Sequence, residues 1–167
     1  PPRSTLFPYT TLFRSLPFNL TSGYSGFDTP TGFLQFNKAL TARVEAYRGN
    51  SSAVLSALGG SFMNMTGDLT TGVYHTFSLS GADLANPLFI AQNQEANVRV
   101  AHSSFLADAE AGDSRINKVT LRDTPREASG LVGTHDVWIY QSLEDSTPII
   151  RNAELILLYA EANMVSN

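Results

Sequence analysis

The stretch from Thr147 to Met164 constrains the fold most, because it predicts a helix that is apolar around most of its circumference. Thr147 is a favoured N-cap residue and Pro148 suits the first helical position, so the helix is predicted to begin near residue 148. The hydrophobic residues at helical spacing are Ile150, Ala153, Leu157, Ala160 and Met164. Such a helix must be covered on several sides, so we expect the rest of the chain to pack around it.

The few charges of this helix are predicted to form one seam. Arg151, Glu154 and Glu161 are three and seven residues apart, which brings side chains back to nearly the same helical face. We interpret them as structural, pairing with one another and with a second helix through Arg43. A catalytic carboxylate pair is not expected, because seven residues of helix separate the two backbones by about 10.5 Å, whereas glycosidases need carboxyls about 5 to 9.5 Å apart.

Two segments resemble the SusD/RagB family. Residues 148–162 read Pro-Ile-Ile-Arg-Asn-Ala-Glu-Leu-Ile-Leu-Leu-Tyr-Ala-Glu-Ala, which is similar to the family's most characteristic motif: an apolar pair, Arg, Ala-Glu, an apolar run and Ala-Glu-Ala. Ala39, Leu40, Ala42, Arg43 and Val44 also resemble a segment of its helical scaffold. These proteins are surface lipoproteins of Bacteroidetes-type bacteria that capture glycans or other nutrients and deliver them to a TonB-dependent, SusC-like transporter.

The resemblance implies a mainly helical α+β fold, with a tetratricopeptide-like scaffold and short strands and long loops between the helices. It further implies binding without catalysis, no cofactor, and attachment to the outer membrane through a lipid anchor that this chain lacks. Residues 1–15 repeat Thr-Leu-Phe between Arg-Ser pairs and are interpreted as a non-native segment derived from a sequencing adapter. Residues 16–167 are interpreted as a fragment of a longer protein with a SusD/RagB-like domain.

A helical hairpin is predicted near the N-terminus. Phe33, Phe36, Leu40, Val44 and Tyr47 form an apolar stripe over residues 31–48, and Gly49-Asn50 is a stop signal. A second helix is predicted from residue 51 or 52 to Leu58. The helix over residues 31–48 is expected to pack antiparallel or at a shallow angle against the C-terminal helix, with Leu40 and Leu157 both buried. Because so few elements cannot cover the C-terminal helix, Leu155 to Met164 is expected to expose an apolar patch.

The centre of the chain, residues 61–146, is predicted to form short strands and loops. Strand candidates are residues 72–79, 118–122 and 135–141, and a short helix is predicted over residues 103–110. The aromatic residues here are the candidate ligand contacts, because a sugar ring stacks on a flat side chain. Trp138 and Tyr140 would share one face of a strand, with Tyr74 as a weaker third candidate. Packing against the helices remains the alternative for all three.

Composition and motifs exclude several classes of function. A net charge of −4 with 11 basic residues argues against nucleic-acid binding. The sequence also contains no run of the roughly 20 apolar residues that are needed to span a membrane. No metal site, phosphate loop or nucleophile elbow is predicted, and the chain has no cysteine. A helical-repeat scaffold that binds only proteins remains the alternative function. A hydrolase is a third option, which lacks a usable constellation of residues.

Overall fold

The computed structural model describes residues 16–128 and 130–165, so the segment interpreted as adapter-derived lies outside the described residues. The chain divides into two compact units. One, the helical unit, contains the residues up to Thr76 and those from Ser146 onward. The other, the hairpin unit, contains Phe77–Asp145. No helix in the described part is long and apolar enough to span a bilayer.

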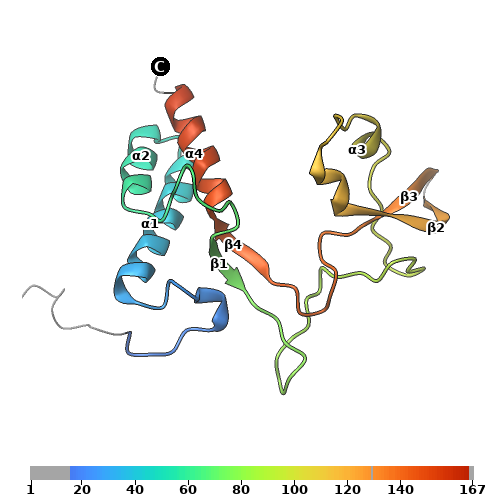
Figure 1. The fold of residues 1–167 in the computed structure, drawn as a ribbon, viewed down its shortest axis with the longest axis horizontal. Coiled ribbons are helices and arrows are strands. Elements are labelled where there is room, and N and C mark those ends of the chain that lie inside the picture. The colour runs from blue at the N-terminus through green and yellow to red at the C-terminus, as the bar shows by residue number, and fades with distance from the viewer. Residues whose placement is uncertain (1–15, 129, 166–167) are drawn as a thin grey trace, which may run out of the picture. The chain divides into compact units, whose positions relative to one another are not determined.

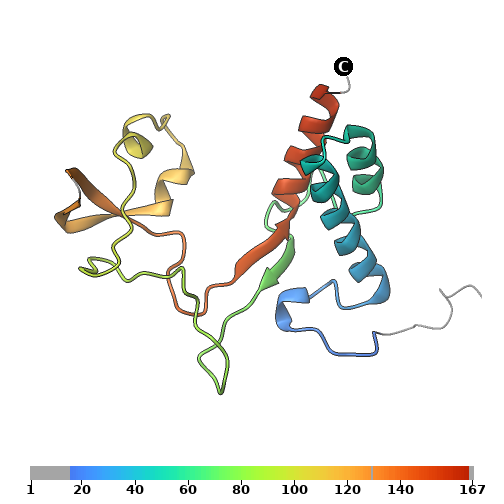
Figure 2. The same ribbon diagram turned by 180° about the vertical axis from the view of Figure 1, so that it is seen from behind.

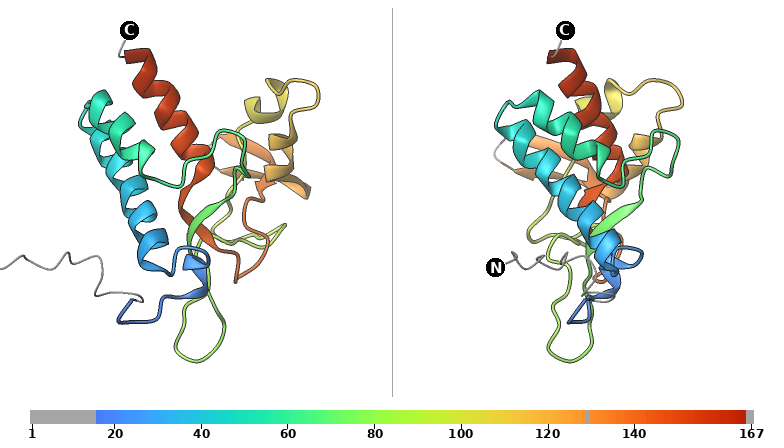
Figure 3. Two further views of the ribbon diagram at one scale, coloured as in Figure 1. Left: turned by 60° about the vertical axis from the view of Figure 1, so that its left-hand side comes forward. Right: turned by 90° about the vertical axis from the view of Figure 1, so that its left-hand side faces the viewer.

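The helical unit consists of three helices beside a small sheet (Figure 1). Its elements are the short 3-10 helix η2 (Ser22–Tyr24), α1 (Pro30–Tyr47), α2 (Ser51–Gly59), β1 (Gly72–His75), β4 (Thr147–Arg151) and α4 (Asn152–Val165). Strands β1 and β4 pair antiparallel, and Figure 2 shows them side by side from behind. Helix α4 packs against both α1 and α2 (Figure 3).

The predicted helical hairpin is present with nearly the predicted bounds, because its local signals are strong. The Thr29 hydroxyl accepts a hydrogen bond from the Gly32 N–H at 3.1 Å, and Pro30 occupies the first helical position. Helix α1 ends where Gly49 adopts a φ of +70°, a conformation that glycine reaches at little cost. The Asn50 side chain then accepts from the Ala53 N–H and caps α2.

Small residues let the three helices approach closely. Ala39 and Ala42 on α1 are fully buried, and Ala57 on α2 and Ala162 on α4 are nearly so. The largest fully buried apolar side chains of this core come from α2, β1, β4 and α4: Val54, Val73, Ile150 and Leu155. The core therefore lies between the helical hairpin, the small sheet and one face of α4.

The predicted start of the C-terminal helix is wrong. Residues Thr147–Arg151 form β4, and the helix begins only at Asn152, whose backbone N–H donates to the Thr71 carbonyl at 2.8 Å. Pairing with β1 overrides the local Thr-Pro signal because it buries Ile150 to 1% exposure. Pro148 is tolerated because it lies where the register with β1 shifts, and irregular sheet positions accept proline.

The prediction that Leu157 is buried is also wrong, since this side chain is 69% exposed. Leu40 is half-buried against the core. The expected apolar patch over Leu155 to Met164 is present only in part, because Leu155 is buried while Leu157 and Met164 are exposed. Helices α1 and α4 both run toward the end of the unit at which the C-terminus lies (Figure 1), so they are not antiparallel.

The hairpin unit is built on a two-stranded antiparallel sheet. Its elements are α3 (Ser104–Ala107), the 3-10 helix η3 (Ser114–Lys118), β2 (Val119–Ala128) and β3 (Leu131–Val137). The buried Asn86 connects two segments near the ends of the unit. Its side-chain amide donates to the Asp145 carbonyl at 2.7 Å, and its backbone N–H donates to the Leu143 carbonyl at 2.7 Å. The strands differ in length and position from the predicted ones, because cross-strand pairing rather than local alternation sets their ends.

A buried ion pair lies at the centre of this unit. Arg122 on β2 donates to the Asp136 carboxylate on β3, and the two residues are 4% and 3% exposed. The second Asp136 oxygen accepts from the Asn93 N–H at 2.8 Å, while Arg122 also donates to the Gln94 carbonyl at 3.2 Å. Both charges are thus satisfied by hydrogen bonds, as burial requires. The pair fastens the loop around Asn93 to the hairpin.

The predicted tetratricopeptide-like scaffold is contradicted. Among the described residues the chain has four α-helices and two small antiparallel sheets, which is an α+β fold. In the described part of the chain, α1 and α2 are the only consecutive helices that form a helical hairpin. Between α2 and α4 the chain forms loops, strands, the four-residue helix α3 and the 3-10 helix η3. The glycine, proline and asparagine residues of this central segment interrupt helical periodicity too often for further helical pairs to form.

Candidate functional site

The structure brings Arg43 and Glu154 together from α1 and α4. Arg43 Nε and Nη2 donate to the two Glu154 carboxylate oxygens at 2.5 and 2.6 Å, and Nη2 also donates to the Ile149 carbonyl at 2.6 Å. The hydrogen bonds with Glu154 raise the pKa of Arg43, although partial burial opposes this shift. These hydrogen bonds join α1, α4 and β4 of the helical unit, so Arg43 and Glu154 stabilise the fold of this unit.

The other two residues of the predicted seam do not join this pair. Arg151 is exposed on β4 opposite Gly72, and Glu161 is exposed on α4. Because residue 151 lies in a strand, the helical spacing that predicted the seam does not apply to it. Glu161 borders a hollow of about 70 Å³ between α4 and the start of α2, which is far smaller than a typical ligand pocket.

Arg43→Ala is expected to lower the free energy of unfolding of the helical unit by about 1.5 to 3 kcal/mol, because a charged hydrogen-bonded group loses its partner. Denaturant unfolding followed by far-ultraviolet circular dichroism measures this change. Arg48→Ala is the matched control, since the Arg48 side chain directly after α1 is 70% exposed and pairs with Glu45, three residues earlier in the chain. The control should lose about 0.5 kcal/mol or less. Equal losses in the two variants would contradict the structural role of Arg43.

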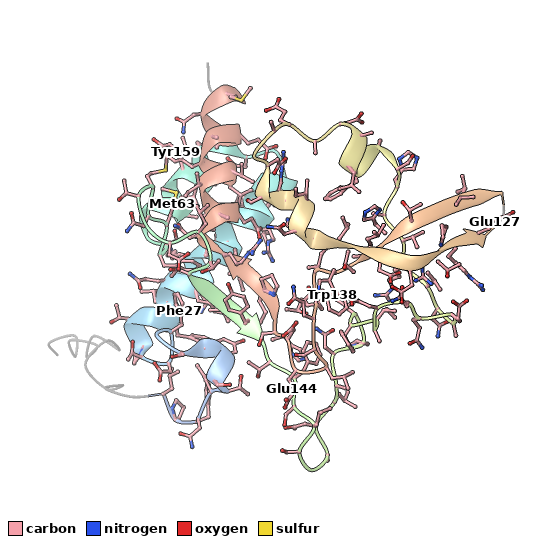
Figure 4. The ribbon with its side chains drawn as sticks, turned by 45° about the vertical axis from the view of Figure 1, so that its right-hand side comes forward. Phe27, Met63, Glu127, Trp138, Glu144 and Tyr159 are labelled. Carbon is pink, nitrogen blue, oxygen red and sulfur yellow. The ribbon has the colours of Figure 1, made fainter. Side chains whose placement is uncertain are left out.

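The predicted aromatic pair does not lie on a strand. Strand β3 ends at Val137, and both Trp138 and Tyr140 lie on the loop that follows it. Figure 4 labels Trp138. The Trp138 ring is half-buried, with its centre 6.2 Å from that of Phe89. Its backbone N–H donates to the Lys118 carbonyl at 2.6 Å. Trp138 therefore packs against a loop of the hairpin unit, whereas the alternative prediction had placed it against the helices.

Tyr74, the third aromatic candidate, borders a groove in the helical unit. The groove has a volume of about 490 Å³, within the range of small-ligand sites, and we call it the Tyr74 groove. Six of its lining residues carry aliphatic hydroxyls: Ser22, Ser25, Thr70, Thr71, Thr76 and Ser146. The remaining lining residues are Gly23, Phe27, Asp68, Gly72 and Tyr74. The lining thus combines many hydroxyls with two aromatic side chains.

The aromatic side of the groove follows from the alternation of β1. Val73 is fully buried in the core, and successive strand residues point to opposite faces, so Tyr74 points away from it. The Tyr74 hydroxyl donates to the Thr70 carbonyl, which fixes the orientation of the ring. Phe27 contacts Phe62 edge to face at 4.8 Å and is 7% exposed. Tyr74 therefore offers the more accessible ring.

The opposite wall is held close to β1 by a glycine. A Cβ on Gly23 would lie 1.9 Å from the Tyr74 carbonyl oxygen, so only glycine allows η2 to approach the strand this closely. This packing places Ser22 and Ser25 beside the groove. The sequence pattern around Gly23 shows turn chemistry but does not show which strand the turn meets.

The carboxylate of Asp68 also borders the Tyr74 groove. Asp68 Oδ1 accepts from both the N–H and the hydroxyl of Thr70 at 2.8 Å, and these bonds lower the pKa of Asp68 below its usual value. The loop that carries Asp68 is anchored by the buried Asn152. The Asn152 side chain accepts from the Asn64 N–H at 2.8 Å and donates to the Asn64 and Asp68 carbonyls. Asp68 and its hydroxyl neighbours were not among the predicted site residues.

The groove has little capacity for acid–base or metal chemistry. Among its described lining residues Asp68 is the single titratable carboxylate, so a second carboxylate for glycoside hydrolysis is lacking. The described residues contain no group of three or more His, Asp or Glu side chains arranged to hold a metal ion. What the arrangement offers is hydrogen bonding by hydroxyls together with stacking on Tyr74.

Comparison with known proteins gives no match to any family model, to any curated protein or to any solved structure.

Proposed function

We propose that this chain captures an oligosaccharide, or a nutrient of similar hydroxyl content, in the Tyr74 groove and does not convert it chemically. The composition of the groove carries the proposal. Sugars present both hydroxyls and an apolar ring face, so they are best held by small polar groups beside one aromatic ring. The six aliphatic hydroxyls and Tyr74 match that pattern, whereas an apolar ligand would displace water from the hydroxyls without replacing its hydrogen bonds.

Rigid positioning supports the proposal as well. The residues of the groove come from η2 and the turn after it, the loop before β1, β1 and the residue after it, and the residue before β4. Each is fastened to the core: the loop through Asn152, and η2 through the contact of Gly23 with β1. A preformed site loses less conformational entropy when it binds a ligand.

The cellular role in the proposal rests on the sequence resemblance alone. The residues similar to the SusD/RagB motif favour a surface lipoprotein of the outer membrane that passes its ligand to a TonB-dependent, SusC-like transporter. Co-purification of the protein with a co-expressed TonB-dependent transporter tests this part. If the protein binds a glycan but no transporter co-purifies with it, the delivery part of the proposal is contradicted and the glycan-binding part remains.

The test of the groove is a titration of the protein with a glycan panel by isothermal calorimetry. The best ligand is expected to bind Tyr74→Ala about tenfold more weakly than the unaltered protein, the loss typical of a central aromatic contact. Tyr47→Ala is the matched control, because Tyr47 is 86% exposed on α1 and does not border the groove. Equal affinity of the unaltered protein and the Tyr74 variant would contradict the assignment, as would a panel without any ligand.

A second candidate function is binding of a protein partner through α4. The observation that favours it is the exposure of Leu157 and Met164, at 69% and 80%. Exposed apolar side chains one or two turns apart on a helix are typical of a contact surface. Loss of partner binding in Leu157→Asp with unchanged glycan binding would support this second function.

A further inference from the structure

The described lining of the Tyr74 groove carries one negative charge and no positive charge. Asp68 is ionised at neutral pH, because the two hydrogen bonds from Thr70 stabilise its carboxylate form. None of the other described lining residues is Lys, Arg or His. A ligand in this groove therefore meets one fixed negative charge and no compensating cation.

One oxygen of this carboxylate is available to a ligand. Both hydrogen bonds from Thr70 go to Oδ1, and among the described residues none donates to Oδ2. The backbone of Asp68 is fixed as well, since its carbonyl accepts from the Thr71 N–H at 3.2 Å and from the Asn152 amide at 3.2 Å. Oδ2 is thus a preorganised acceptor beside a row of hydroxyls. A positively charged donor gains more from such an acceptor than a neutral hydroxyl does.

We infer that the Tyr74 groove prefers a sugar carrying a protonated amine to the equivalent neutral sugar and discriminates against acidic sugars, with Asp68 as the residue that sets this preference. The inference rests on the proposed function, because it specifies the ligand class of the same groove. A primary ammonium group on the sugar ring would donate to Oδ2, while the ring itself lies against Tyr74. A uronic or sulfated sugar would bring a second negative charge near Asp68.

The test compares short β-1,4-linked oligomers of glucosamine and of glucose, which differ by an ammonium group in place of a hydroxyl. At pH 6 the glucosamine oligomer is expected to bind about fivefold more tightly, the effect of one ion pair in an open site. An oligogalacturonate is expected to bind least. The preference should shrink as salt is added, because exposed charges are screened.

Asp68→Asn keeps the shape of the side chain and an oxygen that accepts from Thr70, but it removes the charge. This variant should bind the glucosamine and glucose oligomers with equal affinity. Glu161→Gln is the matched control, since it removes an exposed carboxylate of the same unit that does not border the groove. It should keep the fivefold preference.

The outcomes separate the two proposals. Equal binding of both oligomers by the unaltered protein, with weaker binding in Tyr74→Ala, overturns the role of Asp68 and leaves the groove as the binding site. Failure of every oligomer to bind overturns both. An amine preference that persists in Asp68→Asn also overturns the inference, because another group would then set the preference.

Discussion

Truncation of Leu155 to alanine is expected to lower the free energy of unfolding of the helical unit by about 2 to 5 kcal/mol, the range for emptying a buried leucine site. Leu155 is fully buried on the face of α4 that packs against the helical hairpin and the small sheet. The three long helices belong to this unit, so circular dichroism at 222 nm during denaturant unfolding reports on it.

Leu157→Ala is the matched control, because it removes the same atoms two residues later on the same helix. Its side chain is 69% exposed, so the expected loss is about 0.5 kcal/mol or less. A larger loss for Leu157 than for Leu155 would show that α4 presents its opposite face to the core.

The second large effect is expected in the hairpin unit. Asp136→Ala should lower its free energy of unfolding by about 3 to 5 kcal/mol. The buried Arg122 would lose its hydrogen-bonded carboxylate and keep the longer pairing with the exposed Glu95 at 3.6 Å, and the Asn93 N–H would lose its acceptor. The single tryptophan of the chain, Trp138, lies in this unit. Its fluorescence therefore follows the relevant transition separately from the helical signal.

A double variant separates loss of the pair from loss of packing. Arg122→Met combined with Asp136→Leu replaces both charges by apolar groups and should be more stable than Asp136→Ala. A loss below about 1 kcal/mol in Asp136→Ala would contradict the burial of the pair, since exposed pairs contribute no more than that.

Local signals were sufficient to predict the helical hairpin. Thr29 and Pro30 start α1, Gly49 ends it, and Asn50 starts α2, so each boundary depends on residues within one turn of it. The start of α4 could not be predicted in this way. Thr147 and Pro148 satisfy the rules for a helix start, but pairing with β1, more than 70 residues earlier in the chain, determines their structure.

The burial of Leu157 was predicted wrongly for a different reason. A helix that is apolar around most of its circumference has no preferred face, so its sequence does not indicate which side meets the core. Contacts with α1 and α2 select the side of Leu155 and Ala162 and leave Leu157 and Met164 exposed. The error in fold class has another origin, because the tetratricopeptide-like scaffold was inferred from similarity in two helical segments alone.

The candidate site was only partly accessible from the sequence. Tyr74 could be chosen because it is an aromatic residue on a predicted strand. Trp138 was chosen for the same reason, yet its ring packs beside Phe89 on a loop. The hydroxyl residues and Asp68 are common loop residues far apart in the sequence. Only the close approach allowed by Gly23 and the anchoring by Asn152 show that they share one groove.

The most direct test of the proposed function is a nuclear magnetic resonance titration of ¹⁵N-labelled protein with the tightest ligand from the glycan panel. We expect the largest amide shift changes within residues 22–25 and 68–76, the two segments that contain most of the lining residues of the Tyr74 groove, and small changes at Trp138 and Tyr140. Changes centred on Trp138 and Tyr140, or none at a saturating ligand concentration, would contradict the assignment of ligand binding to this groove.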